Sequence, residues 1–138
     1  MNAIDDPLGE VLDVMSCNEY IGWYSNAAED CGKTTWTSKY NKPLIMSEFG
    51  GEAVAGLHGK ADEIWTEEYM DRIYKNQTAM LDKIPFLRGA SPWILMDFRS
   101  PLRLRPTKQD YYNRKGVISD KGIKKLAFYT MQAWYQRK

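Results

Sequence analysis

The sequence of 138 residues is poor in the side chains that most metal and thiol sites require. It contains a single histidine, His58, and two cysteines, Cys17 and Cys31, which lie in no CxxC pattern. One histidine excludes a zinc site built from a His/Cys cluster, and two cysteines are too few for a disulfide scaffold. We therefore expect buried thiols, no bound metal and no cofactor.

Long apolar runs and a strong net charge are also missing. The apolar runs are a handful of residues long, whereas a membrane-spanning helix needs roughly 18. The formal net charge is only +1, although nucleic-acid-binding domains are usually strongly basic. We expect neither a membrane nor a nucleic acid as partner, and a soluble protein of the cytoplasm or periplasm.

The charge that is present is unevenly distributed. Residues 1–98 carry 8 basic and 16 acidic side chains, whereas residues 99–138 carry 11 basic and 2 acidic ones. A basic C-terminal third favours either an anionic ligand or, more simply, a solvated helix face. Aromatic residues make up 13% of the chain, and their flat faces are surfaces on which sugars stack.

Three apolar runs predict buried strands at residues 11–18, 43–48 and 89–98, the last interrupted by Pro92. Near-continuous apolarity of this kind is typical of parallel strands covered on both faces. The carboxyl ends of such strands share one rim, where ligands bind in βα architectures. At this rim Glu48 is the most prominent candidate, although a carboxylate at a strand end also commonly caps or pairs with an arginine.

Apolar residues at helical spacing predict helices over residues 65–84, ended by Pro85, and over 123–134, with Lys125 off the apolar stripe. A short irregular helix is expected at residues 35–40. The result is an α/β fold of about three βα units, which is less than half of an eight-unit barrel of about 250 residues. Because such a sheet has two open edges, we expect it to associate with itself or with the remainder of a barrel.

Six segments in one collinear order resemble the C-terminal half of the catalytic barrel of family 2 glycoside hydrolases, especially the β-glucuronidases. They are residues 18–24, 42–50, 55–58, 65–69, 93–98 and 113–116. The resemblance covers about residues 8–137. It implies a partial TIM barrel, in which residues 1–138 supply strands six to eight of a (β/α)8 barrel. It also implies that the other strands and the family's β-sandwich domains are absent from this chain.

The resemblance further implies a retaining hydrolase with Glu48 as the nucleophile and Tyr20 as its hydrogen-bond partner. Such enzymes need a second carboxyl roughly 5 Å away as general acid/base. In this family that residue lies some 90 positions before the nucleophile, whereas Glu19 precedes Glu48 by only 29. We therefore interpret Glu19 as the middle residue of an Asn-x-Tyr pattern, and we expect the acid/base outside this chain.

The remaining site residues implied by the resemblance contact a carbohydrate substrate. Trp93 would form the floor of the sugar subsite, and an Asn-x-Lys pattern would bind the carboxylate of a glucuronic acid. The expected substrate contacts are Asn18, Trp23, Tyr24, Trp93, Asn113 and Lys115.

Two other functions remain open. One is a family 2 hydrolase of neutral sugars such as β-galactosides, and the other is a non-catalytic carbohydrate-binding or structural half-barrel. Three further residues have simple structural interpretations: His58 as a surface hydrogen-bonding residue, and Arg103 and Arg105 as solvated loop charges, although both arginines also suit an aglycone or extended-glycan subsite.

Overall fold

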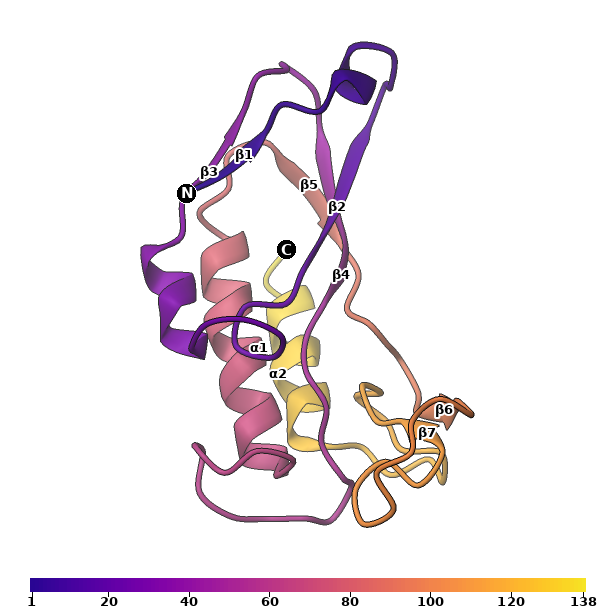
Figure 1. Cartoon of the computed structure of the whole chain (residues 1–138). Helices are drawn as coiled ribbons and strands as arrows, with labels where there is room; N and C mark the ends of the chain where they lie inside the picture. The colour runs from indigo at the N-terminus through magenta and orange to yellow at the C-terminus, as the bar shows by residue number, and fades with distance from the viewer.

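A computed structural model describes all residues, 1–138, and its centre is a three-stranded parallel sheet (Figure 1). The strands are β2 (Met15–Glu19), β4 (Leu44–Phe49) and β5 (Leu87–Ala90), in the order β2-β4-β5. The central strand β4 pairs in parallel with both neighbours. This confirms the predicted α/β fold with parallel strands, and the sheet is open rather than closed into a barrel.

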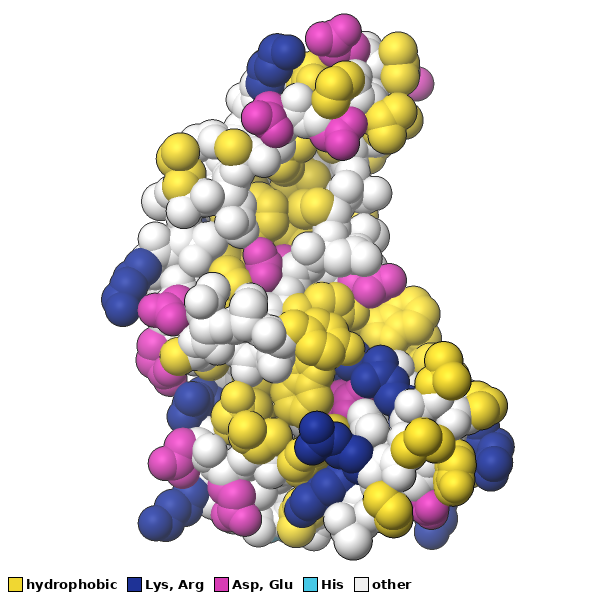
Figure 2. Space-filling model, viewed as in Figure 1, with side chains coloured by type: hydrophobic (Ala, Val, Ile, Leu, Met, Phe, Trp, Pro, Cys, Tyr) yellow, Lys and Arg dark blue, Asp and Glu magenta, His cyan; other side chains and the backbone are white.

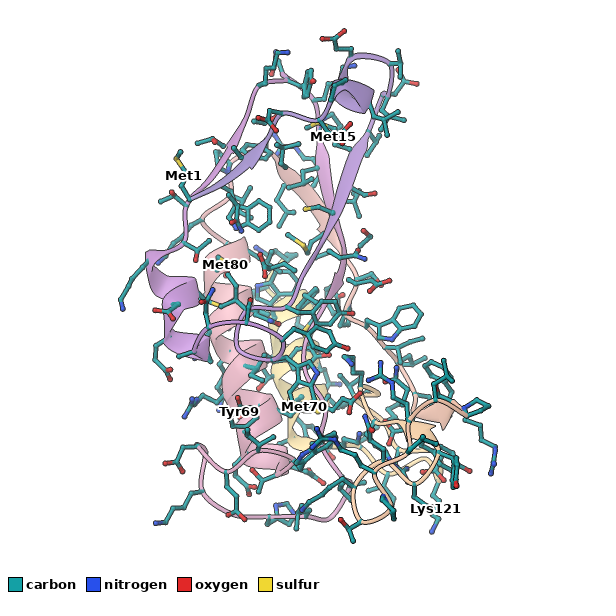
Figure 3. The ribbon with its side chains drawn as sticks, in the orientation of Figure 1. Met1, Met15, Tyr69, Met70, Met80 and Lys121 are labelled. Carbon is teal, nitrogen blue, oxygen red and sulfur yellow. The ribbon has the colours of Figure 1, made fainter.

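Two helices, α1 (Glu67–Leu81) and α2 (Leu126–Tyr135), lie side by side in Figure 1 and pack against each other. Phe49 of β4 is fully buried and its ring contacts Tyr74 of α1 and Trp134 of α2. The sheet and both helices therefore share one hydrophobic core. Labelled residues in Figure 3 trace α1, with Tyr69 and Met70 in its first turns and Met80 near its end.

The ends of the predicted strands differ from the observed ones. β2 begins at Met15, not residue 11, because the preceding residues form a short 3-10 helix, η1 (Pro7–Glu10), and a turn. The third strand ends at Ala90, two residues before a proline that cannot donate to the ladder. The chain then forms a separate antiparallel pair, β6 (Phe98–Arg99) with β7 (Tyr112–Asn113).

The prediction of a short helix at residues 35–40 is wrong. This region contains β3 (Trp36–Ser38), which pairs in parallel with β1 (Asn2–Ile4), and the helical segment before it is the 3-10 helix η2 (Ala28–Lys33). Consecutive β-branched and aromatic residues at 34–37 favour extended backbone. The strand β1 at the N-terminus supplies the partner of β3. Only the 3-10 helix η2 and β3 therefore lie between β2 and β4, and this connection contains no α-helix.

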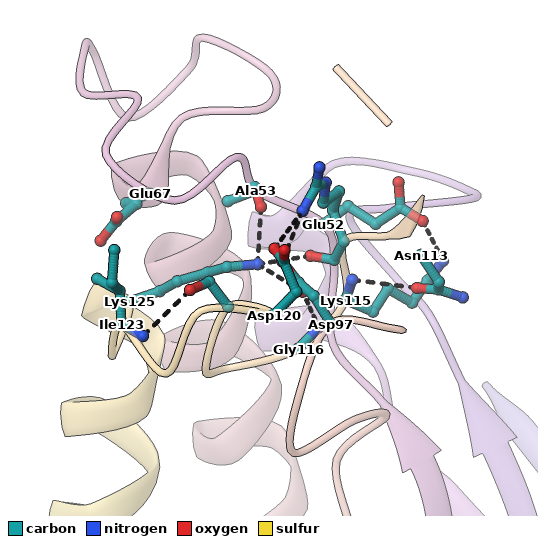
Figure 4. Close-up of polar contacts among 12 residues, drawn as sticks. Glu52, Ala53, Glu67, Asp97, Asn113, Lys115, Gly116, Asp120, Ile123 and Lys125 are labelled. Carbon is teal, nitrogen blue, oxygen red and sulfur yellow. Dashed lines mark hydrogen bonds and ion pairs between the residues drawn. The ribbon is translucent and has the colours of Figure 1, made fainter. Parts of the chain in front are cut away.

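Lys125 is not on a solvated helix face, contrary to the sequence expectation. The helix begins at Leu126, so Ile123 is 54% exposed outside it and Lys125 occupies the N-cap position. The Lys125 side chain is fully buried, and its Nζ donates to Asp97 Oδ1 at 2.9 Å (Figure 4). Its other two acceptors are the carbonyl oxygens of Ala53 at 2.8 Å and Arg114 at 2.9 Å.

Asp97, the other member of this pair, also accepts the backbone N–H of Gly116 at 2.9 Å. A Cβ on Gly116 would lie 2.1 Å from the Asp97 nitrogen, so only glycine permits this approach. Burial raises the pKa of Asp97 and lowers that of Lys125, so each group depends on the other for its charge. The pair joins the loop after β4, the segment after β5 and the start of α2.

Replacing Lys125 by Met should destabilise the fold by about 3–5 kcal/mol, because the substitution leaves Asp97 buried without a counter-charge. Urea denaturation measures the loss in the free energy of unfolding, provided that the variant and the wild type show the same dependence of that free energy on urea concentration. The matched control is Lys121→Met, since Lys121 is exposed and its side chain makes no ion pair. Equal stability of the two variants would show that the pair does not hold these segments together.

The open sheet predicts association of the isolated chain of 138 residues. Within the sheet, β2 and β5 each pair only with β4, and the apolar side chains of Leu95 and Met96 after β5 are 62% and 44% exposed. Unpaired edges and exposed apolar groups favour contacts between copies. Size-exclusion chromatography with light scattering should detect oligomers, and a monodisperse monomer would contradict this expectation.

Candidate active site

Glu48 and Tyr20 meet at the carboxyl ends of two adjacent strands. The register between β2 and β4 shifts between Cys17 and Asn18, which places Asn18 opposite Glu48. The Tyr20 hydroxyl, just beyond β2, donates a hydrogen bond to Glu48 Oε2 at 2.8 Å. Burial and this hydrogen bond both raise the pKa of Tyr20, so the phenol stays protonated and remains a donor to the carboxylate.

The backbone on both sides of Glu48 is firmly held. Gly50 has φ +126°, and a Cβ there would lie 2.4 Å from the Tyr74 hydroxyl, so the chain leaves β4 by a route that only glycine permits. The Ser47 hydroxyl lies 3.0 Å from the Cys17 carbonyl oxygen and 2.9 Å from Asn18 Oδ1. Asn18 is exposed and its amide nitrogen has no protein acceptor, so that group is available to a ligand.

Aromatic side chains surround this rim. The rings of Tyr20 and Tyr24 lie 5.1 Å apart, and Trp23 contacts Tyr24 edge-on at 6.4 Å. The backbone nitrogen of Trp93 donates to the Phe49 carbonyl oxygen at 2.9 Å, which places Trp93 beside the end of β4. The structure therefore brings together the aromatic residues that the sequence singled out around Glu48.

Lys115 is enclosed on the same rim, with 1% of its surface exposed. Its Nζ donates to the Tyr24 hydroxyl at 2.7 Å and to Glu52 Oε1 at 3.0 Å. The ammonium also lies 4.7 Å from the ring centroid of Tyr24 and within 6 Å of two further aromatic rings. Asn113 is buried beside it, and its Oδ1 accepts the Lys115 backbone N–H at 3.1 Å. Asn113 thus shapes the turn that presents Lys115.

Glu52 is the residue of this site that the sequence analysis missed. It is fully buried and accepts Gln109 Nε2 at 2.9 Å in addition to Lys115. Arg103 Nη1 lies 3.5 Å from its Oε1, so Arg103 is not the solvated loop charge that we expected. Two features of the sequence could have indicated Glu52 as a site residue. It directly follows Gly50 and Gly51 at a strand end, and it lies in the acidic segment 1–98, which could pair with the basic segment 99–138.

Lys115 and Arg103 also change the pKa of Tyr24. The Tyr24 hydroxyl accepts a hydrogen bond from Lys115 Nζ and another, at 3.5 Å, from Arg103 Nη2. Burial alone would raise the pKa of Tyr24, but the hydrogen bonds from the two cations outweigh it and lower the pKa overall. Tyr24 is nevertheless 60% exposed. Its hydroxyl therefore links the enclosed ammonium to the open side of the site.

Other candidates lie outside this constellation. Both carboxylate oxygens of Glu19 are occupied, by the Ile21 backbone N–H at 2.8 Å and by Asn2 Nδ2 at 2.9 Å. His58 is a surface residue whose Nδ1 lies 2.8 Å from Glu68 Oε1, as we expected. No group of three His, Cys, Asp or Glu side chains is placed to bind a metal ion. No helix has the length and apolarity to span a membrane.

Comparison with known proteins agrees with this geometry. Residues 4–85, more than half of the chain, match the family model for the TIM barrel domain of glycosyl hydrolases family 2. A β-glucuronidase of Streptococcus agalactiae is 31% identical over 123 residues, which cover 83% of this chain and 20% of that protein. The β-glucuronidase of Rattus norvegicus is 29% identical over 139 residues, covering 91% of this chain and 20% of the relative. The chain thus spans about a fifth of the length of the curated relatives it matches.

Solved structures show the same fold. A β-glucuronidase of Ruminococcus gnavus superposes with a TM-score of 0.78 and 25% identity, covering 94% of this chain and 23% of that one. A β-galacturonidase of Eisenbergiella tayi bound to galacturonate gives a TM-score of 0.76 at 22% identity, covering 91% of this chain and 24% of that one, a likeness of fold alone. These matches confirm the partial TIM barrel expected from the sequence. The chain belongs to glycosyl hydrolase family 2 and forms part of its TIM barrel domain.

Proposed function

We propose that this chain is part of a retaining glycoside hydrolase that cleaves β-glucuronides, with Glu48 as its nucleophile. The observation that carries this proposal is the hydrogen bond from Tyr20 to Glu48 at the carboxyl ends of adjacent parallel strands. This is the rim at which TIM barrels place their catalytic groups. The relatives named β-glucuronidases support the substrate class.

In the proposed reaction Glu48 attacks the anomeric carbon, and a covalent glycosyl-enzyme forms as the leaving group departs. The Tyr20 hydroxyl stabilises the ionised carboxylate and orients one of its oxygens, which leaves the other free to attack. The acid/base must be a second carboxyl. Glu19 does not suit that role because both of its oxygens are held inside the protein, so we assign the acid/base to another part of the barrel.

Substrate binding in this proposal uses the aromatic rim. Trp93 is half-buried beside the end of β4 and offers a face on which a sugar ring can stack. Asn18 offers its free amide nitrogen next to Glu48. Trp23 and Tyr24 form the adjoining wall.

The charges around Lys115 suit an anionic sugar. Lys115 and Arg103 are two cations that share one carboxylate, Glu52, so the group carries one net positive charge. A uronic acid brings one negative charge, which that excess would balance. The Tyr24 hydroxyl accepts hydrogen bonds from both cations and is the exposed part of this group. A substrate carboxylate would therefore bind beside Tyr24. Asn113 supports this arrangement by holding the turn before Lys115.

One observation favours the neutral-sugar alternative. Lys115 already has Glu52 as a counter-ion at 3.0 Å. A lysine in that position can serve the structure alone, and the substrate would then be a neutral glycoside such as a β-galactoside.

Replacing Glu48 by Gln in the full-length enzyme should lower kcat for an aryl β-glucuronide by several orders of magnitude, because the shape is kept and the nucleophilic charge is lost. Substrate binding should survive. Steady-state and binding measurements test both points, with Glu10→Gln as a control because Glu10 is exposed and lies in η1, before the start of β2 and away from the strand ends that carry Glu48. Activity of the Glu48 variant within tenfold of wild type would reject the nucleophile assignment.

Replacing Lys115 by Ala should lower kcat/KM for a glucuronide at least tenfold and affect a matched galactoside much less. The reason is that a charge-assisted contact to a uronate is worth roughly 1.5–3 kcal/mol. Lys115→Met, which keeps the aliphatic volume, separates loss of charge from loss of packing. If both substrates lose activity equally in both variants, the lysine is structural and the neutral-sugar alternative is favoured.

A further inference from the structure

A cavity of about 750 Å³ adjoins the candidate active site, with Trp23, Tyr24 and Arg103 in its lining. Residues from three segments line it: 23–24, 64–69, which includes the first turn of α1, and 100–109. Its volume is within the range of about 300–1,000 Å³ that is usual for small-ligand sites. Figure 2 shows hydrophobic side chains next to Lys and Arg side chains on the lower half of the face in view.

Two charged residues line this cavity, Arg103 and Arg105. Both are cations, and no carboxylate is in the lining. Arg103 shares the buried Glu52 with Lys115, but Arg105 makes no ion pair or side-chain hydrogen bond within the protein. The Arg105 guanidinium lies 5.9 Å from the ring centroid of Trp65. A ligand in this cavity would therefore meet an uncompensated positive charge, which favours an anionic group.

The rest of the lining favours a sugar ring. Four aromatic residues contribute, Trp23, Tyr24, Trp65 and Tyr69. Trp65 meets Trp23 edge-on at 5.2 Å, and Tyr69 fixes the loop below by donating from its hydroxyl to the Gly22 carbonyl oxygen at 2.9 Å. Faces held rigidly in this way bind amphipathic rings with little loss of conformational entropy.

The backbone of Trp65 is strained. Its φ is +80°, a left-handed conformation that is rare for a bulky residue. The conformation is maintained by the Val54 backbone N–H, which donates to the Trp65 carbonyl oxygen at 3.0 Å, and by the bridge between Ala53 and Trp65. Strain of this kind concentrates at ligand sites, and here it sets a tryptophan in the cavity wall.

We propose that this cavity is a second subsite, which binds an acidic sugar unit joined to the sugar that Glu48 attacks. The unit is a pyranose that bears a carboxylate or a sulfate ester. Trp23, Tyr24 and Arg103 belong both to the cavity wall and to the surroundings of Lys115, so the two subsites are neighbours. This inference rests on the proposed function and extends it: the substrate is an acidic oligosaccharide rather than a simple glucuronide.

The test uses the full-length protein carrying Glu48→Gln, so that ligands bind without turnover. Isothermal titration compares disaccharides with a terminal β-glucuronic acid whose second sugar bears a carboxylate, a sulfate or no charge. We expect at least one charged disaccharide to bind tenfold or more tightly than the neutral one. The preference between carboxylate and sulfate identifies the natural class of the second sugar.

Arg105→Gln should remove that tenfold advantage, and Arg105→Lys should keep part of it. The control is Lys108→Gln, which makes the same change of charge on the same loop outside the cavity lining and should keep the advantage. Equal affinity for charged and neutral disaccharides would overturn the proposal, as would an equal loss for all three ligands in Arg105→Gln. The proposed function is tested separately, by hydrolysis of an aryl glucuronide by the full-length enzyme with Glu48 in place. The two tests can fail independently, because the binding measurements require no catalysis.

Discussion

The rim of this partial barrel depends on one buried ammonium group. Lys125 Nζ has three protons, and the protein supplies an acceptor for each: the Asp97 carboxylate and the carbonyl oxygens of Ala53 and Arg114. A buried charge is tolerated only when it is paired and its hydrogen bonds are complete. The three acceptors come from three different segments, so the cost of burying the charge is offset only when all three segments are in place.

This requirement reaches the site through the neighbouring residues. Ala53 directly follows Glu52, and Arg114 directly precedes Lys115. Because Lys125 binds the carbonyl oxygens of both, and the Ala53 N–H donates to the Arg114 carbonyl oxygen, Glu52 and Lys115 are brought within 3.0 Å of each other. One buried ion pair, Lys125 with Asp97, therefore aligns a second one, Lys115 with Glu52.

The paired charges also explain the uneven charge distribution of the sequence. The basic third of the chain meets the acidic part across the rim, through Lys115 and Arg103 with Glu52 and through Lys125 and Arg114 with Asp97. The interpretation as a solvated helix face does not describe these contacts, because the charges are paired within the protein. Most of the asymmetry near the rim reflects pairing within the protein, and Arg105 is the cation there that such pairing leaves over.

Sequence reasoning succeeded where a local pattern carries the information. The apolar runs predicted the parallel strands, and the strand ends predicted that Tyr20 and Glu48 share a rim. It failed where the outcome depends on a distant partner. Lys125 is polar and off the apolar stripe, so nothing local indicates that Asp97 will enclose it, and the strand β3 exists because β1, more than thirty residues earlier, pairs with it. Glu52 was missed because its partners lie more than fifty residues further along the chain.

The register shift between β2 and β4 limits where this chain tolerates changes in length. The ladder passes from Cys17 opposite Met46 to Asn18 opposite Glu48, so Ser47 is skipped and its hydroxyl fills the gap. Side chains alternate between the two faces of a strand, so adding or removing one residue in β2 or β4 would turn Tyr20 away from Glu48. Between η2 and β4, the register constraint applies only to β3 (Trp36–Ser38), which pairs with β1, and the residues on either side of β3 belong to no strand. Natural variation in chain length among relatives should therefore accumulate in the connecting loops and be absent between Met15 and Tyr20.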